Sequence, residues 1–195
     1  MVYRVCLFGH SYVGDLSRYG KTEISVNGID FSLDYIFVPG ATFSTFINNS
    51  LHFDQLKVLS PDFVVVILGG NDIKIDVDLS KIYEDCTRFY NLLRERLPSA
   101  VIIAAQIENR FYLDTNRFGC PPADKFDFLR RHFNRFLKNK AFKDCLLQVQ
   151  GPGRLDNEEN YRDRVHLNYL GISKYFEIIE NCLSYAFTKK FVNKL

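Results

Sequence analysis

The stretch VCLFGHSYVG, residues Val5–Gly14, decides the fold and raises the first question about function. It opens with an apolar run typical of a buried β-strand, stops at Gly9, and places Ser11 two residues later. Three interpretations compete: a loop that cradles phosphate, a nucleophile at the top of a sheet, or an ordinary turn. The rest of the sequence decides among them.

The phosphate interpretation fails at required positions. Gly9 and Gly14 have the spacing of a P-loop, but Asp15 and Leu16 follow where lysine and serine or threonine are needed. Ser11 also occupies the second glycine position of the dinucleotide-binding pattern. Both phosphate-binding signatures are therefore excluded.

Strand-like and helix-like segments alternate along the chain. Apolar β-type runs are expected at 3–8, 33–38, 63–68, 101–105 and 145–149, and helical periodicity at 79–97, 125–142 and 168–187. The third and fourth runs are continuously apolar, as in strands covered on both faces. The pattern predicts one α/β domain built on a parallel sheet.

Composition places the chain among globular proteins. It has 195 residues, 47% of them hydrophobic, a net charge of +2 and five scattered cysteines without a C-x-x-C pair, which favours a reducing compartment. No apolar stretch approaches the roughly 20 residues of a membrane span, and no signal peptide precedes the first strand. We expect a cytoplasmic protein, and because Met1 leads directly into strand residues we expect a domain of a longer chain.

A serine nucleophile needs a base, and the base needs an orienting group. Of the four histidines, His132 lies among arginines and His52 lacks an obvious partner. His166 follows Asp163 by three residues, so one turn of chain can bring the carboxylate to Nδ1 and leave Nε2 facing Ser11. A single Asp-x-x-His is nevertheless more often a surface ion pair, so the motif needs support from elsewhere.

Two further strand ends carry hydrogen-bond donors. The strand at 63–68 ends in Gly69-Gly70-Asn71-Asp72, and the strand at 33–38 ends in Pro39-Gly40-Ala41. The Asn71 amide and the Gly40 N–H can each donate to a developing oxyanion, although each motif alone is better explained as a turn. A metal hydrolase is a remote alternative, because only Asp163 and His166 have ligand spacing.

Taken in order, these motifs form a specific pattern. FGHS contains Ser11, PGAT contains Gly40, GGND contains Asn71, and DRVHLN contains Asp163 and His166. The sequence resembles the SGNH (GDSL-like) hydrolase family over nearly its whole length. The resemblance implies a flavodoxin-like three-layer α/β/α sandwich with a central parallel five-stranded sheet, formed by residues 1–195 as one domain, and an esterase or acetylhydrolase that uses no metal or other cofactor.

The resemblance also implies a role for each motif residue. Ser11 would be the nucleophile, His166 the general base and then acid, and Asp163 the group that orients His166. The N–H groups of Ser11 and Gly40 and the side chain of Asn71 would form the oxyanion hole.

One position departs from the family pattern. The family usually has aspartate before its serine, where this chain has His10. We expect the His10 side chain to point away from Ser11 and to change a local hydrogen bond, which would lower activity or shift its pH dependence.

The sequence is less specific about the subgroup of the family to which it is similar. The compact size resembles the platelet-activating-factor acetylhydrolases, which cleave small acyl groups, while GHSYV and RDRVHLNYLG resemble the esterase domain of the first-open-reading-frame proteins of some non-LTR retrotransposons. A stand-alone cellular esterase remains an equal alternative, because a fold does not decide function. A binding or assembly module with an unused triad is the alternative from another class.

Two segments bear on substrates and partners. The loop 106–123 is long enough for a lid, and its apolar residues could cover the acyl site, enter a membrane surface or pack on the domain; they are Phe111, Tyr112, Leu113 and Phe118. The basic segment 125–143 is best explained as a solvated helix face. The alternative is attraction to anionic lipid or nucleic acid, although in a retrotransposon protein other parts would bind the nucleic acid.

Overall fold

A twisted sheet forms the centre of the computed structural model, which describes residues 1–111, 121–143, 147–149 and 155–192. The strands are β1 (Val2–Gly9), β2 (Glu23–Val26), β3 (Ile29–Phe37), β4 (Phe63–Ile67), β5 (Val101–Ala105) and β6 (Leu147–Val149). Their order is β2-β3-β1-β4-β5-β6. All neighbours pair in parallel except β2, which runs antiparallel to β3. The five predicted parallel strands and the α/β fold class are confirmed.

The edge strand β2 was not predicted. It is only four residues long, and Glu23 on it is exposed. The turn that joins β2 to β3 is Asn27-Gly28, in which both residues have positive φ (54° and 77°). Asn-Gly is the pair that a two-residue hairpin turn favours, so the signal for this hairpin was in the sequence.

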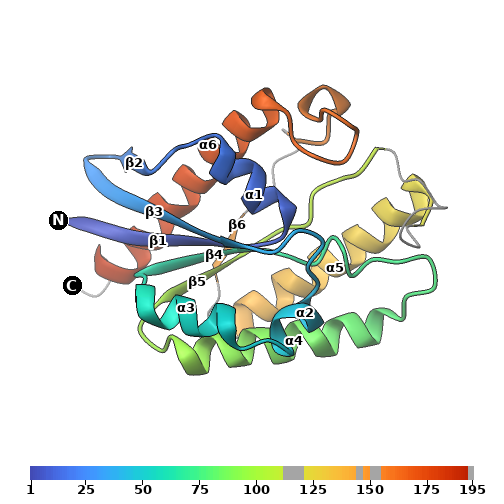
Figure 1. Cartoon of the computed structure of the whole chain (residues 1–195), viewed down its shortest axis with the longest axis horizontal. Coiled ribbons are helices and arrows are strands. Elements are labelled where there is room, and N and C mark those ends of the chain that lie inside the picture. Colours follow the sequence, from blue (N-terminus) through green and yellow to red (C-terminus); the bar gives the residue numbers. More distant parts are fainter. Residues whose placement is uncertain (112–120, 144–146, 150–154, 193–195) are drawn as a thin grey trace.

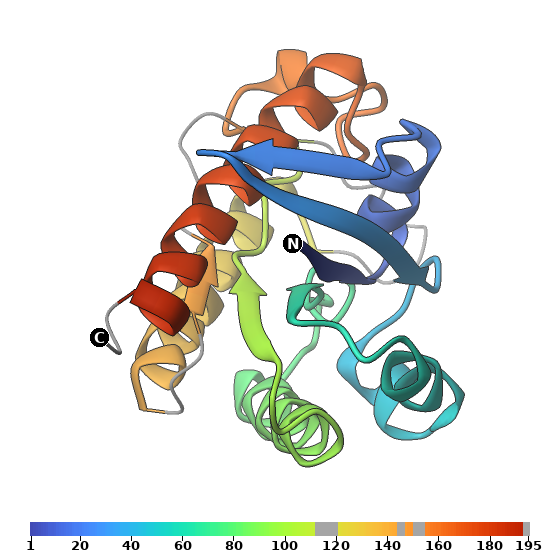
Figure 2. The ribbon, with the colours of Figure 1, turned by 90° about the vertical axis from the view of Figure 1, so that its left-hand side faces the viewer.

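Helices cover both faces of the sheet. They are α1 (Ser11–Arg18), α2 (Phe43–Ile47), α3 (Leu51–Leu59), α4 (Leu79–Arg96), α5 (Ala123–Lys143) and α6 (Tyr169–Phe187), with short helical turns at Glu158–Asn160 and Thr188–Val192. Helices α1 and α6 lie on one face and α2 to α5 on the other (Figure 1), and the view along the sheet shows the three layers (Figure 2). The predicted sandwich is confirmed; helices α1, α2 and α3 are additional to the three predicted.

Successive side chains along a strand point to opposite faces of the sheet, so the hydrophobic core has two parts. Cys6 and Phe8 of β1 pack toward α2 to α5, whereas Val5 and Leu7 pack toward α1 and α6. All five residues of β4 are buried, as expected for a central parallel strand. Within the described residues, no helix is long and apolar enough to cross a bilayer.

The topology gathers the strand ends at one edge. Parallel strands present their carboxyl ends together, and ligands of open α/β sheets bind there. Ser11 follows β1, Gly40 follows β3, Asn71 follows β4 and the segment 106–110 follows β5. The candidate site is built from these four connections and from the loop before α6.

Candidate active site

Ser11 is the first residue of α1, directly beyond the end of β1. His10 precedes it as the N-cap: its Nδ1 accepts a hydrogen bond from the Tyr12 N–H at 3.3 Å. Ser11 is half-buried, and its hydroxyl makes no hydrogen bond within the described residues. The side chain is therefore free for chemistry.

His10 takes the place of the aspartate that the family pattern expects. The ring is buried, with 4% of its surface exposed. Burial, followed by the charges of Arg110 and His166, lowers the pKa of His10 to about 3. His10 is thus a neutral cap at physiological pH, and since Nδ1 accepts, its hydrogen is carried on Nε2.

Asp163 and His166 lie together in the loop before α6. Nδ1 of His166 is 2.8 Å from Oδ2 of Asp163, whose Oδ1 also accepts from the backbone N–H groups of His166 (2.6 Å) and Val165 (3.0 Å). Burial opposes the charge of Asp163, but these hydrogen bonds outweigh it and hold the pKa of the carboxyl below its usual range. An ionised carboxylate can only accept, so Nδ1 of His166 carries a hydrogen and Nε2 has the lone pair.

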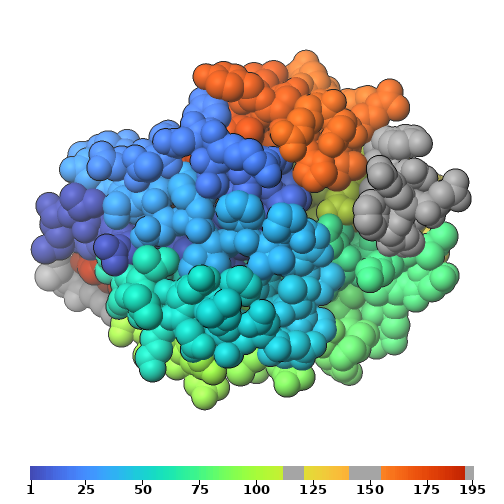
Figure 3. Space-filling view, in the orientation of Figure 1, coloured from blue at the N-terminus to red at the C-terminus, as the bar shows by residue number. Residues whose placement is uncertain are grey.

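Two contacts hold this loop against the helix that begins with Ser11. The Tyr12 hydroxyl donates to the Val165 carbonyl at 2.6 Å, and Arg162 Nη2 donates to Oδ1 of the buried Asp15 at 2.9 Å. The loop and α1 lie side by side in the space-filling view (Figure 3, orange and blue). The Tyr12 and His166 rings are 6.5 Å apart, centroid to centroid. His166 therefore lies in a loop that contacts Tyr12, the residue after Ser11, and no hydrogen bond within the described residues joins the His166 and Ser11 side chains.

The ends of β3 and β4 are also joined. Nδ2 of Asn71 donates to the Ala41 carbonyl at 3.0 Å, and Oδ1 of Asp72 accepts from the Phe43 N–H at 3.2 Å. Gly40 has a positive φ of 75°. Within the described residues, the N–H groups of Ser11 and Gly40 donate no hydrogen bond. Donors without partners within the described residues therefore remain at two of the connections that meet at the strand ends, the start of α1 and the segment after β3.

Asp72 makes stability depend on pH. Burial, despite the hydrogen bond from Phe43, raises the pKa of Asp72 to about 7, against about 3.9 in unfolded chains. Its contribution to the free energy of unfolding is therefore fully present below about pH 4 and is lost as pH rises through about 7, by up to about 4 kcal/mol.

We expect Asp72→Asn to flatten the decline in melting temperature between pH 5 and pH 8, because the amide cannot ionise. Thermal unfolding of both proteins across this range measures the difference. Glu108, whose pKa burial raises to about 8 despite nearby Arg130, affects both proteins equally. Parallel pH curves would contradict the assignment.

Other expected site residues lie apart or outside the described part. Tyr112, Leu113 and Phe118 lie outside the described residues. Phe111 packs on the domain, with its ring 5.2 Å from that of Tyr161 and its N–H bonded to the Arg164 carbonyl at 2.9 Å.

Part of the basic segment is neutralised locally. Arg130 and Arg131 of α5 each form an ion pair with Asp127 at 2.5 Å. Their charge is therefore partly balanced on the same helix.

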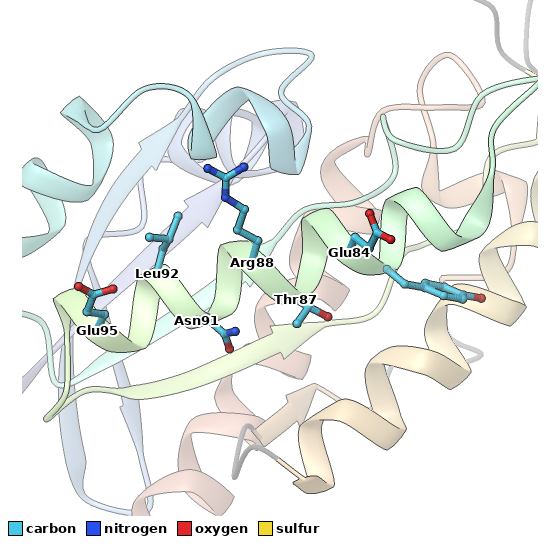
Figure 4. Close-up of a pocket in the computed structure, with 7 residues that line it drawn as sticks. Glu84, Thr87, Arg88, Asn91, Leu92 and Glu95 are labelled. Atoms are coloured by element: carbon cyan, nitrogen blue, oxygen red, sulfur yellow. The ribbon is translucent and has the colours of Figure 1, made fainter.

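Two hollows formed by described residues lie elsewhere. One of about 580 Å³ runs along α4 (Figure 4), lined by Tyr83, Glu84, Thr87, Arg88, Asn91, Leu92 and Glu95. None of its lining residues lies in a connection at the carboxyl end of a strand, and so we do not assign a catalytic role to this hollow. Within the described residues, no three His, Cys, Asp or Glu side chains gather as metal ligands.

Sequence reasoning missed three contributors to the site. Tyr12 and Asp15 hold the His166 loop, and Arg110 donates to Asn71 Oδ1 at 2.9 Å. Their sequence signal is weak because each contact joins segments far apart in the chain. The only indication was that residues after parallel strands meet at one edge.

Comparison with solved structures identifies the class of fold. No family model matches the chain, and no curated protein matches it. Solved structures with the same fold are GDSL-like lipases and acylhydrolases of the SGNH family.

Three of them illustrate the match. A GDSL-like lipase from Bacteroides thetaiotaomicron is 19% identical with a TM-score of 0.66, covering 96% of this chain and 88% of its own. A putative acylhydrolase from Bacteroides fragilis is 18% identical with a TM-score of 0.63, covering 96% and 87%. An acetyl xylan esterase is 16% identical with a TM-score of 0.63, covering 91% and 98%. At these identities, the match defines the fold.

Proposed function

We propose that this chain is a serine esterase that hydrolyses short-chain acyl esters, acetyl esters above all, including those of lipids. The observation that carries the proposal is the Asp163–His166 pair, held against α1 at the residue next to Ser11. The lipase, acylhydrolase and acetyl xylan esterase neighbours support the same class of reaction.

The proposed reaction uses these residues in two half-reactions. Nε2 of His166 takes the Ser11 hydroxyl proton as Oγ attacks the ester carbonyl, and Asp163 stabilises the imidazolium that forms. The N–H groups of Ser11 and Gly40 and the second Nδ2 hydrogen of Asn71 donate to the oxyanion. His166 then protonates the departing alcohol, and water, deprotonated by His166, releases the acid from Ser11 in the second half-reaction.

A second candidate is a binding or assembly module with an unused triad. The absence of a hydrogen bond between Ser11 and His166 favours it. Catalytic hydrogen bonds are, however, often long before substrate binds. The GHSYV and RDRVHLNYLG blocks support the narrower proposal that the chain is the esterase domain of a retrotransposon protein.

A fluorophosphonate probe distinguishes the two candidates. We expect the wild-type protein to acquire one covalent adduct on Ser11, located by mass spectrometry, and to hydrolyse p-nitrophenyl acetate faster than the butyrate and octanoate esters. A folded protein that neither labels nor turns over these esters would favour the binding module. Faster turnover of octanoate would retain the esterase but contradict the short-chain preference.

A further inference from the structure

Arg110 is a buried cation beside the candidate oxyanion hole. It lies beyond β5 and is 7% exposed. Its Nη2 donates to Oδ1 of Asn71 at 2.9 Å, and its guanidinium lies 5.1 Å from the centre of the Phe126 ring. Within the described part of the chain, no carboxylate lies within ion-pair distance of Arg110. A buried charge without an opposite charge normally costs stability, and the described contacts of this guanidinium are an amide oxygen and an aromatic ring.

Arg130 provides the contrast within the same protein. It is equally buried, at 8% exposed, but it forms ion pairs with Asp127 at 2.5 Å and with Asp156 at 3.5 Å. These two carboxylates therefore balance the charge of Arg130 locally. Arg110 instead directs its charge at an uncharged amide.

That contact fixes the orientation of the Asn71 amide. A guanidinium only donates hydrogen bonds, so the atom facing Arg110 must be Oδ1. The Ala41 carbonyl only accepts, so the atom facing it, at 3.0 Å, must be Nδ2. With both contacts made, the amide cannot flip, and its second Nδ2 hydrogen has no partner within the described residues.

The glycine before Asn71 makes room for the guanidinium. A Cβ at Gly70 would lie 3.0 Å from Nη2 of Arg110 and 3.6 Å from Nε2 of His10. The field of the cation also reaches the start of α1, because it is one of the charges that lower the pKa of His10. Arg110 therefore lies close to both the amide and the segment that carries Ser11.

We propose that Arg110 is a positioning residue for ester hydrolysis: it locks the Asn71 amide with Nδ2 toward the oxyanion and strengthens that donor with its charge. The inference rests on the proposed esterase function. A donor that polarises Oδ1 makes the Nδ2 hydrogens more positive, which strengthens their hydrogen bond to the negative charge that develops on the ester oxygen. The effect belongs to the transition state, so it changes kcat more than KM.

The test compares Arg110→Met and Arg110→Lys with the control Arg130→Met. We expect Arg110→Met to lower kcat for p-nitrophenyl acetate by about 10- to 100-fold with little change in KM. Arg110→Lys, which keeps a positively charged donor of nearly the same reach but loses the planar guanidinium, should fall between Arg110→Met and wild type. Arg130→Met should lower the melting temperature and leave kcat per active site within about twofold, because Arg130 reaches the connection after β5 only at the Ile107 carbonyl, at 3.4 Å, and has no hydrogen bond to Asn71 or to the segment that carries Ser11.

Coupling to Asn71 separates a positioning role from a structural one. In the Asn71→Ala background, Arg110→Met should have almost no further effect on kcat, because the amide it orients is gone. Active sites are counted by the endpoint of fluorophosphonate labelling, so an unfolded fraction does not alter kcat. An unchanged kcat in Arg110→Met, or losses that multiply in the double variant, would overturn the inference. Wild-type protein that neither labels nor turns over would instead overturn the esterase function itself.

Discussion

Replacing Ser11 with alanine is expected to lower kcat for p-nitrophenyl acetate by about 10⁴- to 10⁶-fold, because the nucleophile and its transferable proton are both lost. The melting temperature should stay within about 2 °C of wild type. The Ser11 hydroxyl makes no hydrogen bond within the described residues, and alanine is a better helix former than serine at the first position of α1. A large loss of activity without a loss of stability distinguishes the nucleophile from a structural serine.

Ser17 offers a matched control on the same helix. It is also half-buried, and it lies near the end of α1, away from the strand ends. Ser17→Ala should leave both kcat and the melting temperature close to wild type. Residual turnover in Ser11→Ala equal to that of the wild type would show that another group carries out the hydrolysis.

Strands β4 and β5 could be predicted because each is a continuous apolar run, and β1, β3 and β6 because apolar β-type residues predominate in each run. Burial on both faces of a central strand such as β4 leaves no polar position to confuse the pattern. Helix α1 was missed because it has only eight residues, a single residue separates it from β1, and Gly14 lies in its middle. Helix α2 has five residues, too few for a helical period to repeat.

The contacts of the candidate site also divide into those that sequence spacing predicts and those that it does not. Asp163 and His166 are three residues apart, so their contact at 2.8 Å depends on one turn of chain and could be predicted from spacing. The contact of Tyr12 with Val165 joins positions 153 residues apart, and that of Arg110 with Asn71 joins positions 39 apart. Such contacts depend on the crossovers of the whole sheet, and no local pattern encodes them.

Gly9→Ala is expected to lower the free energy of unfolding by at least about 3 kcal/mol, which corresponds to about 6–12 °C in melting temperature. A Cβ at Gly9 would lie 1.9 Å from the carbonyl oxygen of Ile67 and 2.7 Å from its carbonyl carbon. Both atoms belong to the backbone of β4, so no side-chain rotation relieves the clash. Strands β1 and β4 must separate at their carboxyl ends, where the His10 N–H bonds to the Ile67 carbonyl at 3.2 Å.

The same separation displaces Ser11 from His166, so kcat per active site should fall together with stability. Gly20→Ala is the matched control: Gly20 also has a positive φ, of 79°, but a Cβ there meets nothing within 4 Å. That substitution adds only backbone strain of about 1–2 kcal/mol and should leave kcat unchanged. Thermal unfolding and ester hydrolysis of both variants measure the difference. A Gly9→Ala protein as stable and active as Gly20→Ala would mean that β1 and β4 are not packed as closely at Gly9 as the structure places them. The expected result would show that a glycine is needed at position 9 because the two central strands approach closely there.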